Sequence, residues 1–248
     1  MKDKVLNFPE TPEEEYYAIA YIDLLGTKEL LDKNNEKDVF EEVYYPFLIA
    51  ERVMPAMQDQ NWDDIKIKIF SDNMLIAYPI NSIDDKNNVY SSYGVVEGFL
   101  KFILPVFAKK GFLFRGAITV DTLFINDLMV WGKGLSSVVY LEENVAIYPR
   151  IIICEDLLKI FDSFGLTGVE FEEKFSCLID SDDCVFFDFF EYYDFESMDS
   201  LLRSTSAHIE EKIQKGASPR VMQKYKWFKN YIERASEIYL EVRQNVKS

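Results

Sequence analysis

The sequence predicts an α+β domain with a mixed, mainly antiparallel sheet, helices on one face and a helical C-terminal extension. Segments with strand and helix patterns follow one another in the order β-α-β-β-α-β-β-α-β over the first three-fifths of the chain. Such a mixed order is typical of a ferredoxin-like or palm arrangement. The 248 residues, 48% of them apolar and 15% aromatic, suffice for one large domain with a sizeable core. We expect that core over residues 1–160, with the strands and helices of residues 161–248 packed on it.

The first expected strand, residues 16–23, is a near-continuous run of apolar, aromatic and β-branched side chains that ends on Asp23. Runs of this kind form central strands that are buried on both faces. Gly26 and Thr27 interrupt the strand pattern. A helical pattern then follows to about Met57, and we expect a kink at Pro46.

A β-hairpin is predicted next. Residues 65–70 alternate between apolar and polar side chains, as a half-buried strand does, and residues 74–78 form an apolar return strand. Between them, Ser71, Asp72 and Asn73 are residue types that favour turns. The pattern therefore places Asp72 at the tip of the hairpin.

The remaining core elements follow from the same periodicities. We expect a helix over residues 89–109, a strand over 112–120, a short return strand near 128–131, a helix over 133–144 and a buried strand over 148–154. The most apolar stretch, residues 94–114, is interrupted by acidic and basic side chains. It is therefore predicted to be a core helix rather than a membrane span.

The last third of the chain is rich in acidic and aromatic residues. Strands are expected near residues 177–179 and 184–187, and two helices follow, with Gly216 ending the first and Pro219 beginning the second. The aromatic run of residues 186–193 fits either an exposed binding stripe or packing against these helices, and packing is the commoner situation. An apolar stripe along the last helix fits packing on the core or on a second subunit, of which we favour the core.

Composition excludes several kinds of partner and chemistry. The chain has 27 basic and 43 acidic residues, a net charge of −16, which disfavours binding to nucleic acid or to an anionic membrane. Three cysteines without CxxC spacing, and a charged N-terminus without an apolar signal region, are typical of a cytoplasmic protein with free thiols. The single histidine, His208, is expected to be exposed on a helix. Any catalysis should therefore rely on carboxylates and metal ions.

Asp23 and Asp72 are the candidate metal ligands. In a β-α-β-β sheet the first strand and the hairpin are neighbours, so both carboxylates can converge at one end of the sheet. Two carboxylates suit Mg²⁺ or Mn²⁺, which prefer oxygen ligands and keep open positions for phosphate. The spacing alone fits a metal site no better than the alternative, in which Asp23 caps the end of a strand and Asp72 is an ordinary turn aspartate.

Four segments in order resemble the motifs of class III nucleotidyl cyclases. Residues 20–27 (Ala-Tyr-Ile-Asp-Leu-Leu-Gly-Thr) resemble the first metal motif, and residues 68–73 (Lys-Ile-Phe-Ser-Asp-Asn) resemble the second. Residues 114–119 (Phe-Arg-Gly-Ala-Ile-Thr) resemble a strand motif, and residues 132–142, which end on a Leu-Glu pair, resemble a helix motif. The whole chain is also similar to bacterial cyclase-like proteins related to the pyrimidine cyclases of the Pycsar anti-phage systems.

The resemblance implies roles for individual residues. The metal ligands for two Mg²⁺ or Mn²⁺ ions would be Asp23, Asp72 and the Leu24 carbonyl. The substrate-binding residues would be Gly26, Thr27 and Lys28 near the phosphates, with Lys68 and Met129 at the base. The core would be a cyclase core, and its site would lie between the two subunits of a homodimer.

The sequence departs from the family pattern at several of these positions. Met129 stands in place of a base-contacting aspartate, Asp121 in place of a glycine, Ser136 in place of the catalytic asparagine and Tyr140 in place of the transition-state arginine. Adenine specificity is therefore not implied. A tyrosine hydroxyl donates one hydrogen bond, whereas an arginine offers a fixed, positively charged fork. The candidates to replace that arginine are Lys28, Lys133 and Arg150, for which ordinary surface roles are the alternative.

Three functions follow from these patterns. The first is a homodimeric cyclase that converts a nucleoside triphosphate into a 3′,5′-cyclic nucleotide and pyrophosphate, with a pyrimidine base and anti-phage signalling as a further suggestion. The second is a catalytically degenerate cyclase fold that acts as a nucleotide-binding or regulatory module. The third retains only the fold and uses the aromatic C-terminal third to bind a partner.

Overall fold

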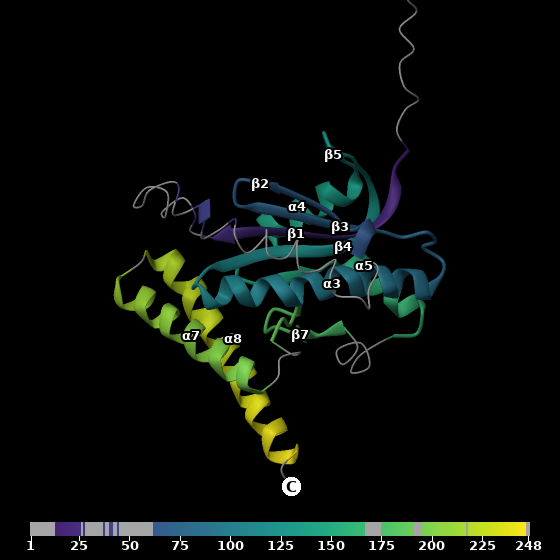
Figure 1. Cartoon of the computed structure of the whole chain (residues 1–248). Coiled ribbons are helices and arrows are strands. Elements are labelled where there is room, and N and C mark those ends of the chain that lie inside the picture. Colours follow the sequence, from purple (N-terminus) through teal and green to yellow (C-terminus); the bar gives the residue numbers. More distant parts are fainter. Residues whose placement is uncertain are drawn as a thin grey trace, which may run out of the picture.

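The computed structural model describes residues 13–25, 27, 37, 40–41, 44, 62–166, 175–190, 195–216 and 218–246. Its centre is a sheet of eight strands in the order β2-β3-β1-β4-β6-β8-β7, with β5 paired to β4 beside this path (Figure 1). The strands are β1 (Glu15–Leu25), β2 (Lys66–Phe70), β3 (Asn73–Pro79), β4 (Leu113–Ile125), β5 (Val130–Trp131), β6 (Ile151–Ile153), β7 (Cys177–Ile179) and β8 (Val185–Phe187).

The strand β1 is central because its side chains are apolar on both faces. It pairs antiparallel with β3 on one side and with β4 along its whole length on the other. Of the pairings among the described strands, only β4 with β6 is parallel, and the chain connects these two strands through α4 (Lys133–Asn144). Because β1 lies between β3 and β4, which α3 (Lys86–Lys109) connects, these elements have the split βαβ arrangement of ferredoxin-like folds. The predicted α+β class and the mainly antiparallel sheet are confirmed.

The two faces of the sheet carry separate apolar cores. Ala18, Ala20 and Ile22 of β1 pack in the core beneath α3 (Lys86–Lys109), whereas Ile19 and Tyr21 belong to a smaller core beneath α4. Helices therefore cover both faces, and the expectation that they would lie on one face was wrong for α4. The helix α4 follows the β4–β5 hairpin and connects the parallel strands β4 and β6 across the face opposite α3.

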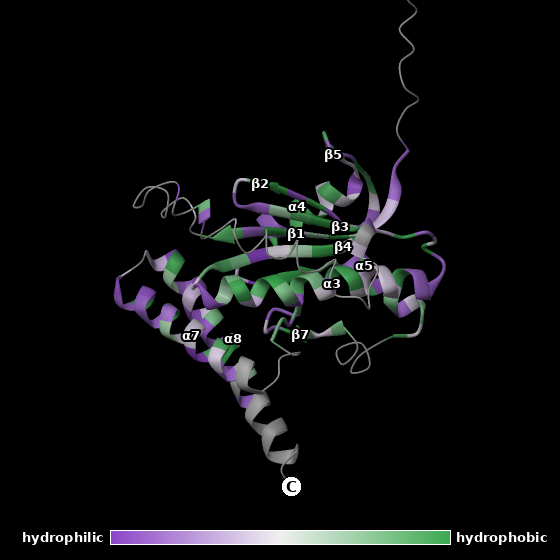
Figure 2. Ribbon diagram, viewed as in Figure 1, coloured by the Kyte–Doolittle hydropathy of each residue, from purple (hydrophilic) through white to green (hydrophobic). Residues whose placement is uncertain are grey.

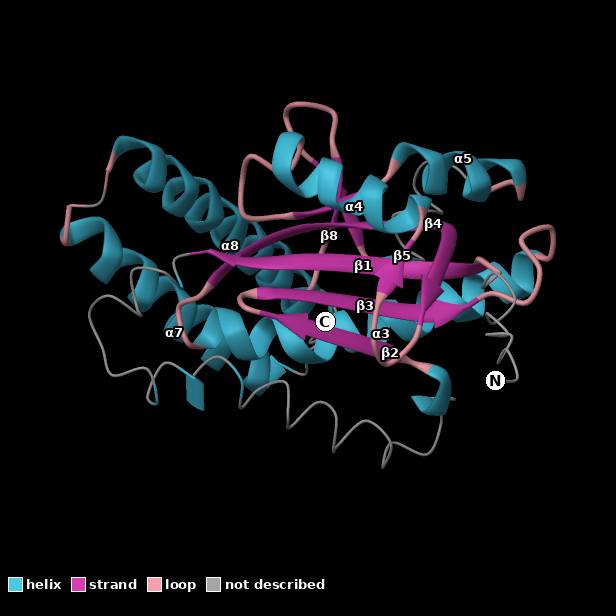
Figure 3. Cartoon of the chain, turned by 90° about the horizontal axis from the view of Figure 1, so that it is seen from above, coloured by secondary structure: helices cyan, strands magenta, loops and turns pink. Residues whose placement is uncertain are grey.

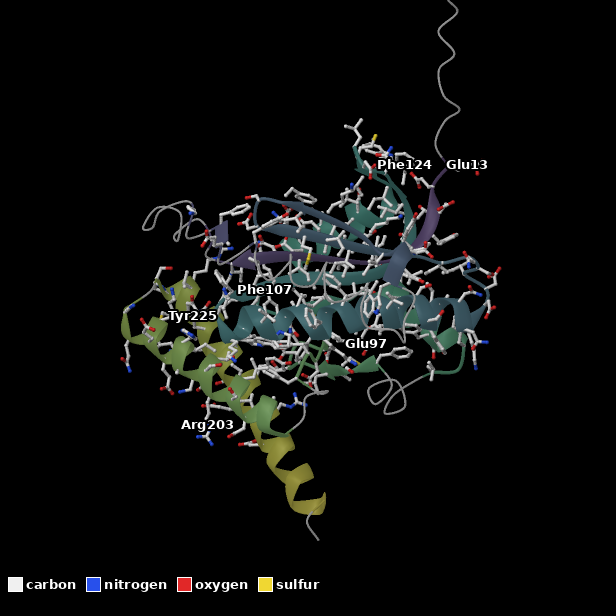
Figure 4. The ribbon with its side chains drawn as sticks, viewed as in Figure 1. Glu13, Glu97, Phe107, Phe124, Arg203 and Tyr225 are labelled. Carbon is white, nitrogen blue, oxygen red and sulfur yellow. The ribbon has the colours of Figure 1, made fainter. Side chains whose placement is uncertain are left out.

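The helix α3 fills most of the larger core. By length and composition it could cross a membrane, but 67% of its most apolar stretch is buried inside the fold. It begins at Asp85, whose side chain accepts a hydrogen bond from the Asn87 N–H. Apolar residues concentrate on α3 and the central strands (Figure 2), and side chains fill the layer between them, where Phe107 is fully buried (Figure 4).

The C-terminal third continues the same sheet. The strands β8 and β7 extend it beyond β6, and α7 (Phe195–Gln214) and α8 (Pro219–Val246) pack against each other. Phe186 and Phe189 are buried and contact the rings of Trp227 and Tyr231 on α8, which confirms packing against the C-terminal helices for residues 186–190, the described part of the aromatic run. In the described part of α8 the apolar stripe is buried in the core, as Phe228, Ile232 and Ala235 show. The boundary near residue 160 stays a prediction.

Some elements differ from expectation. The short helix α5 (Glu155–Ser163) was not predicted, although its apolar residues 157, 158, 160 and 161 recur at helical spacing, and Leu157 and Phe161 are buried. A single 3-10 turn, Trp62–Asp64, precedes β2. His208 is partly buried rather than exposed, and its Cβ lies against Gly111. Cys154 and Cys177 are buried free thiols, as expected. The helix expected up to Met57 lies largely outside the described residues.

Candidate functional site

The end of β1 and the β2–β3 turn meet at one end of the sheet. In the antiparallel register of β1 and β3, Asp23 lies opposite Asn73. One residue further on, the Leu24 N–H donates a hydrogen bond of 2.9 Å to the Asp72 carbonyl. Ser71 takes a positive φ of 59°, which closes the tight turn before Asp72. The structure therefore brings Asp23 and Asp72 together, although they are 49 positions apart in sequence.

Asp72 is held by hydrogen bonds from its neighbours. The Thr27 hydroxyl donates to Asp72 Oδ2 at 2.5 Å, and Asn73 Nδ2 donates to Asp72 Oδ1 at 3.3 Å. The Tyr21 hydroxyl in turn donates to Asn73 Oδ1 at 2.7 Å. Thr27 is buried, with an exposed fraction of 6%, so its hydroxyl is a fixed partner rather than a surface contact. Gly26 and Lys28, the other residues predicted near the phosphates, lie outside the described residues.

Asp23 belongs to a charged cluster that the sequence analysis did not identify. Arg115, its cross-strand neighbour on β4, donates from Nε to Asp23 Oδ2 at 3.2 Å. The same Nε lies 2.5 Å from Glu142 Oε1, which projects from α4 and forms an ion pair without hydrogen-bond alignment. Arg115 is the charged residue of the strand motif, and Glu142 is the acidic residue of the helix motif. Their opposite charges on adjacent elements were the signal that could have predicted this pair.

Burial dominates the electrostatics of the cluster. Removal from water raises the pKa of Asp23, and the Arg115 guanidinium opposes this shift only in part. Burial likewise raises the pKa of Glu142 to about 7, against the attraction of Arg115, and Asp23 adds to the increase. Burial and then the charges of Glu142 and Asp23 raise the pKa of Tyr21 to about 12. One arginine therefore offsets only part of the cost of burying these two carboxylates.

Lys68 and Met129 come together elsewhere on the same side of the sheet. Lys68 Nζ on β2 donates to the Asp127 carbonyl at 3.2 Å, in the turn between β4 and β5. Met129 lies in the same turn with an exposed fraction of 46%. These two predicted base contacts are therefore neighbours.

Ser136 and Tyr140 do not join the aspartates of their own chain. They lie one turn apart on the exposed side of α4, and Tyr140 is 63% exposed. Glu142 lies on the buried side of the same helix. Within one chain, the structure thus separates the predicted catalytic residues from the predicted metal ligands.

Two of the candidates to replace the missing arginine are occupied elsewhere. Lys133 Nζ forms an ion pair with Asp121 Oδ2 at 3.1 Å. Arg150 has a fully buried side chain, not a surface one. It pairs with Asp180 and Asp182 and lies over the rings of Tyr148 and Trp227. Arg150 therefore ties β6, the β7–β8 turn and α8 together, which is a structural role.

The donor set at Asp23 and Asp72 fits a hard divalent cation. Both groups offer carboxylate oxygens, and Arg115 occupies only Oδ2 of Asp23. In the described part of the chain there is no group of three or more His, Cys, Asp or Glu side chains placed to hold a metal. A metal at this pair would therefore complete its coordination with backbone oxygens, water or substrate phosphates, as magnesium commonly does.

Comparison with known proteins finds similarity only at the level of structure. No protein-family model matches the chain, and no curated protein matches it in sequence. The adenylyl cyclase CyaB from P. aeruginosa is 12% identical, with a TM-score of 0.44 over 61% of this chain and 82% of that one. A bacterial light-regulated adenylyl cyclase is 12% identical, with a TM-score of 0.42 over 78% of this chain and 100% of that one. The guanylyl cyclase Cya2 is 11% identical, with a TM-score of 0.40 over 61% and 80%. Similarity this low establishes no shared activity.

Proposed function

We propose that this chain is a metal-dependent nucleotidyl cyclase that converts a nucleoside triphosphate into a 3′,5′-cyclic nucleotide and pyrophosphate in the cytoplasm. The observation that carries the proposal is the juxtaposition of Asp23 and Asp72 at one end of the sheet, within two segments that resemble the cyclase metal motifs. An ordinary turn aspartate would need no second carboxylate beside it. A partly buried carboxylate with a raised pKa, such as Asp23, gains from a bound cation.

Each residue at this end of the sheet would have a distinct role in binding metal or in holding a metal ligand. Asp23, Asp72 and the Leu24 carbonyl would hold two Mg²⁺ or Mn²⁺ ions, which when bound favour ionisation of the ribose 3′-hydroxyl and neutralise the triphosphate. Arg115 fixes the orientation of Asp23 through Oδ2 and leaves Oδ1 for a ligand. Thr27 and Asn73 fix Asp72. These supports reduce the reorganisation needed when substrate binds.

We propose that the active form is a homodimer. The side of the sheet that carries α4 exposes several large apolar residues, among them Phe70 (45%), Leu128 (90%), Met129 (46%) and Trp131 (66%). Exposed apolar groups of this size are costly in water and commonly mark an interface. A second copy covering this side would also bring its Ser136 and Tyr140 towards the aspartates of the first, which one chain cannot do alone.

A nucleotide-binding module without turnover is the second candidate. It is favoured by the replacement of the transition-state arginine by Tyr140 and by the ion pair that already neutralises part of Asp23. The base is also part of the proposal. Met129 offers no charged contact to an adenine amino group, so we propose a pyrimidine triphosphate as substrate and a role in anti-phage signalling.

The test is incubation of the purified protein with each of the four ribonucleoside triphosphates and Mn²⁺, with products identified by mass spectrometry. Asp72→Asn keeps the size of the side chain but removes its charge, and Asp84→Asn on an exposed turn is the matched control. Cyclic product from the wild type and Asp84→Asn, but not from Asp72→Asn, would establish the cyclase and its base. Metal-dependent triphosphate binding without product would support the second candidate, and neither binding nor product would refute both.

A further inference from the structure

The helix α8 passes the end of the sheet at which Asp23 lies (Figures 1 and 3). The ring of Phe228, fully buried on α8, contacts the ring of Phe114 on β4 with centroids 5.9 Å apart. Phe114 pairs with Leu24 in the β1–β4 register, and it directly precedes Arg115. Phe114 faces the core beneath α3, whereas Arg115 points to the α4 side, so α8 is anchored at the end of β4 that carries the charged cluster.

Lys224 lies one helical turn before Phe228, and so on the same side of α8. It is partly buried. The positive charges of Arg115 and Arg220 repel it, whereas the carboxylates of Asp23 and Glu142 attract it. Burial, followed by the charges of Arg115 and Arg220, lowers the pKa of the Lys224 ammonium. The cation thus stands at the edge of the site but is not stabilised there by the protein alone.

Arg115 and Lys224 differ in the ion pairs that they already form. The Arg115 Nε already interacts with Asp23 and Glu142. Lys224 forms no ion pair with any carboxylate in the described part of the chain. A partly desolvated ammonium beside carboxylates that would be occupied by metal ions is well suited to an oxygen-rich anion, because such an anion supplies the missing negative charge.

We propose that Lys224, with Arg220 as an outer second cation, binds the phosphate chain of a nucleotide at the Asp23–Asp72 site. This assignment rests on the proposed function and deepens it. The C-terminal extension would thereby supply the positive charge that Tyr140 lacks. Arg220 is exposed and one turn before Lys224, where it would meet the solvent-facing end of the phosphates.

Binding experiments with the full chain test the assignment. The probes are inorganic tripolyphosphate and a non-cleavable nucleoside triphosphate analogue, each with Mn²⁺, and Mn²⁺ alone. Lys224→Met removes the charge and keeps the apolar stem, and Lys224→Arg retains a cation. Lys226→Met is the matched control, because Lys226 is exposed on another side of the same helix. Thermal unfolding of each variant verifies that it is folded.

We expect Lys224→Met to weaken binding of both phosphate probes by about 10- to 100-fold, the range for a hydrogen bond to a charged group. Lys224→Arg should recover most of this loss, Lys226→Met should bind as the wild type does, and Mn²⁺ affinity without phosphate should not fall. Wild-type affinity in Lys224→Met, while Asp72→Asn loses binding, would overturn the Lys224 assignment and leave the proposed function intact. A wild type that binds neither probe would overturn both.

Discussion

Replacing Arg115 by methionine should destabilise the protein in a manner that depends on pH. The substitution removes the guanidinium between Asp23 and Glu142 and keeps much of the apolar stem. The side chains of Arg115, Asp23 and Glu142 are only 20%, 16% and 5% exposed, so water cannot fully replace the lost charge. Removing one partner of a buried ion pair typically costs about 3–5 kcal/mol, and partial exposure of Arg115 reduces this to roughly 2–3 kcal/mol.

The sign of the pH dependence follows from the raised pKa values. Asp23 and Glu142 already bind protons more tightly in the folded state than in the unfolded one, and loss of Arg115 raises both pKa values further. Folding is therefore least impaired at low pH, where both groups are protonated. The penalty grows as pH rises through the pKa of Glu142, which is about 7 in the folded wild type.

Urea denaturation at pH 5 and at pH 8, without divalent ions, measures this effect. We expect the loss of unfolding free energy in Arg115→Met to be clearly larger at pH 8. Lys215→Met is the control, since both side chains of its ion pair with Glu211 are more than half exposed, and it should change stability little at either pH. An equal loss at both pH values would refute the idea that uncompensated carboxylates cause the destabilisation.

Three further substitutions probe how the site is supported. Gly116→Ala would place a Cβ 2.1 Å from the Tyr21 carbonyl oxygen. We therefore expect the free energy of unfolding, measured by urea denaturation, to fall by roughly 3 kcal/mol. An unchanged unfolding midpoint would contradict the close packing of β1 on β4. Phe228→Ala should lower the free energy of unfolding by about 3–5 kcal/mol, because it removes a fully buried ring. It should also increase amide hydrogen exchange in α8 but not in β1. Arg150→Met should return the pKa of Asp182 from about 2 towards 3.8, as measured by NMR titration. In the wild type, protonation of Asp182 between these pH values lowers the free energy of unfolding, and in the variant this contribution should disappear. A pKa that stays near 2 would show that Arg150 is not its cause.

Local patterns predicted the strands and most helices well, because each depends on a periodicity that neighbouring residues reveal. The helix over residues 133–144 and the strand over residues 177–179 coincide with α4 and β7. The short helix α5 was missed although its pattern was available in the sequence, since apolar residues 157, 158, 160 and 161 recur at helical spacing and acidic residues occupy its first turn. The face on which α4 packs depends on the pairing of β4 with β6, which no local pattern encodes.

The candidate site was predictable in its aspartates but not in its surroundings. Asp23 ends a recognisable strand and Asp72 lies in a recognisable turn. Their proximity therefore followed from the order of the elements. The partnership of Arg115 with Asp23 and Glu142 required the register of β1 with β4 and the rotation of α4. The position of Lys224 required the docking of a helix more than a hundred residues away in sequence, which rests on contacts such as Phe228 with Phe114.

The continuity of the sheet beyond β6 has a consequence for how the chain can be divided. The strand β6 pairs with β4 on one side and with β8 on the other, so β8 and β7 cap what would otherwise be an open edge. A fragment ending near residue 160 would leave open the edge of β6 that pairs with β8, and Phe114 would lose its cover from Phe189 and Phe228. Exposed apolar edges of this kind recruit strands from other molecules. The C-terminal third thus protects the sheet from self-association as well as contributing α8 to the end of the sheet that carries Asp23.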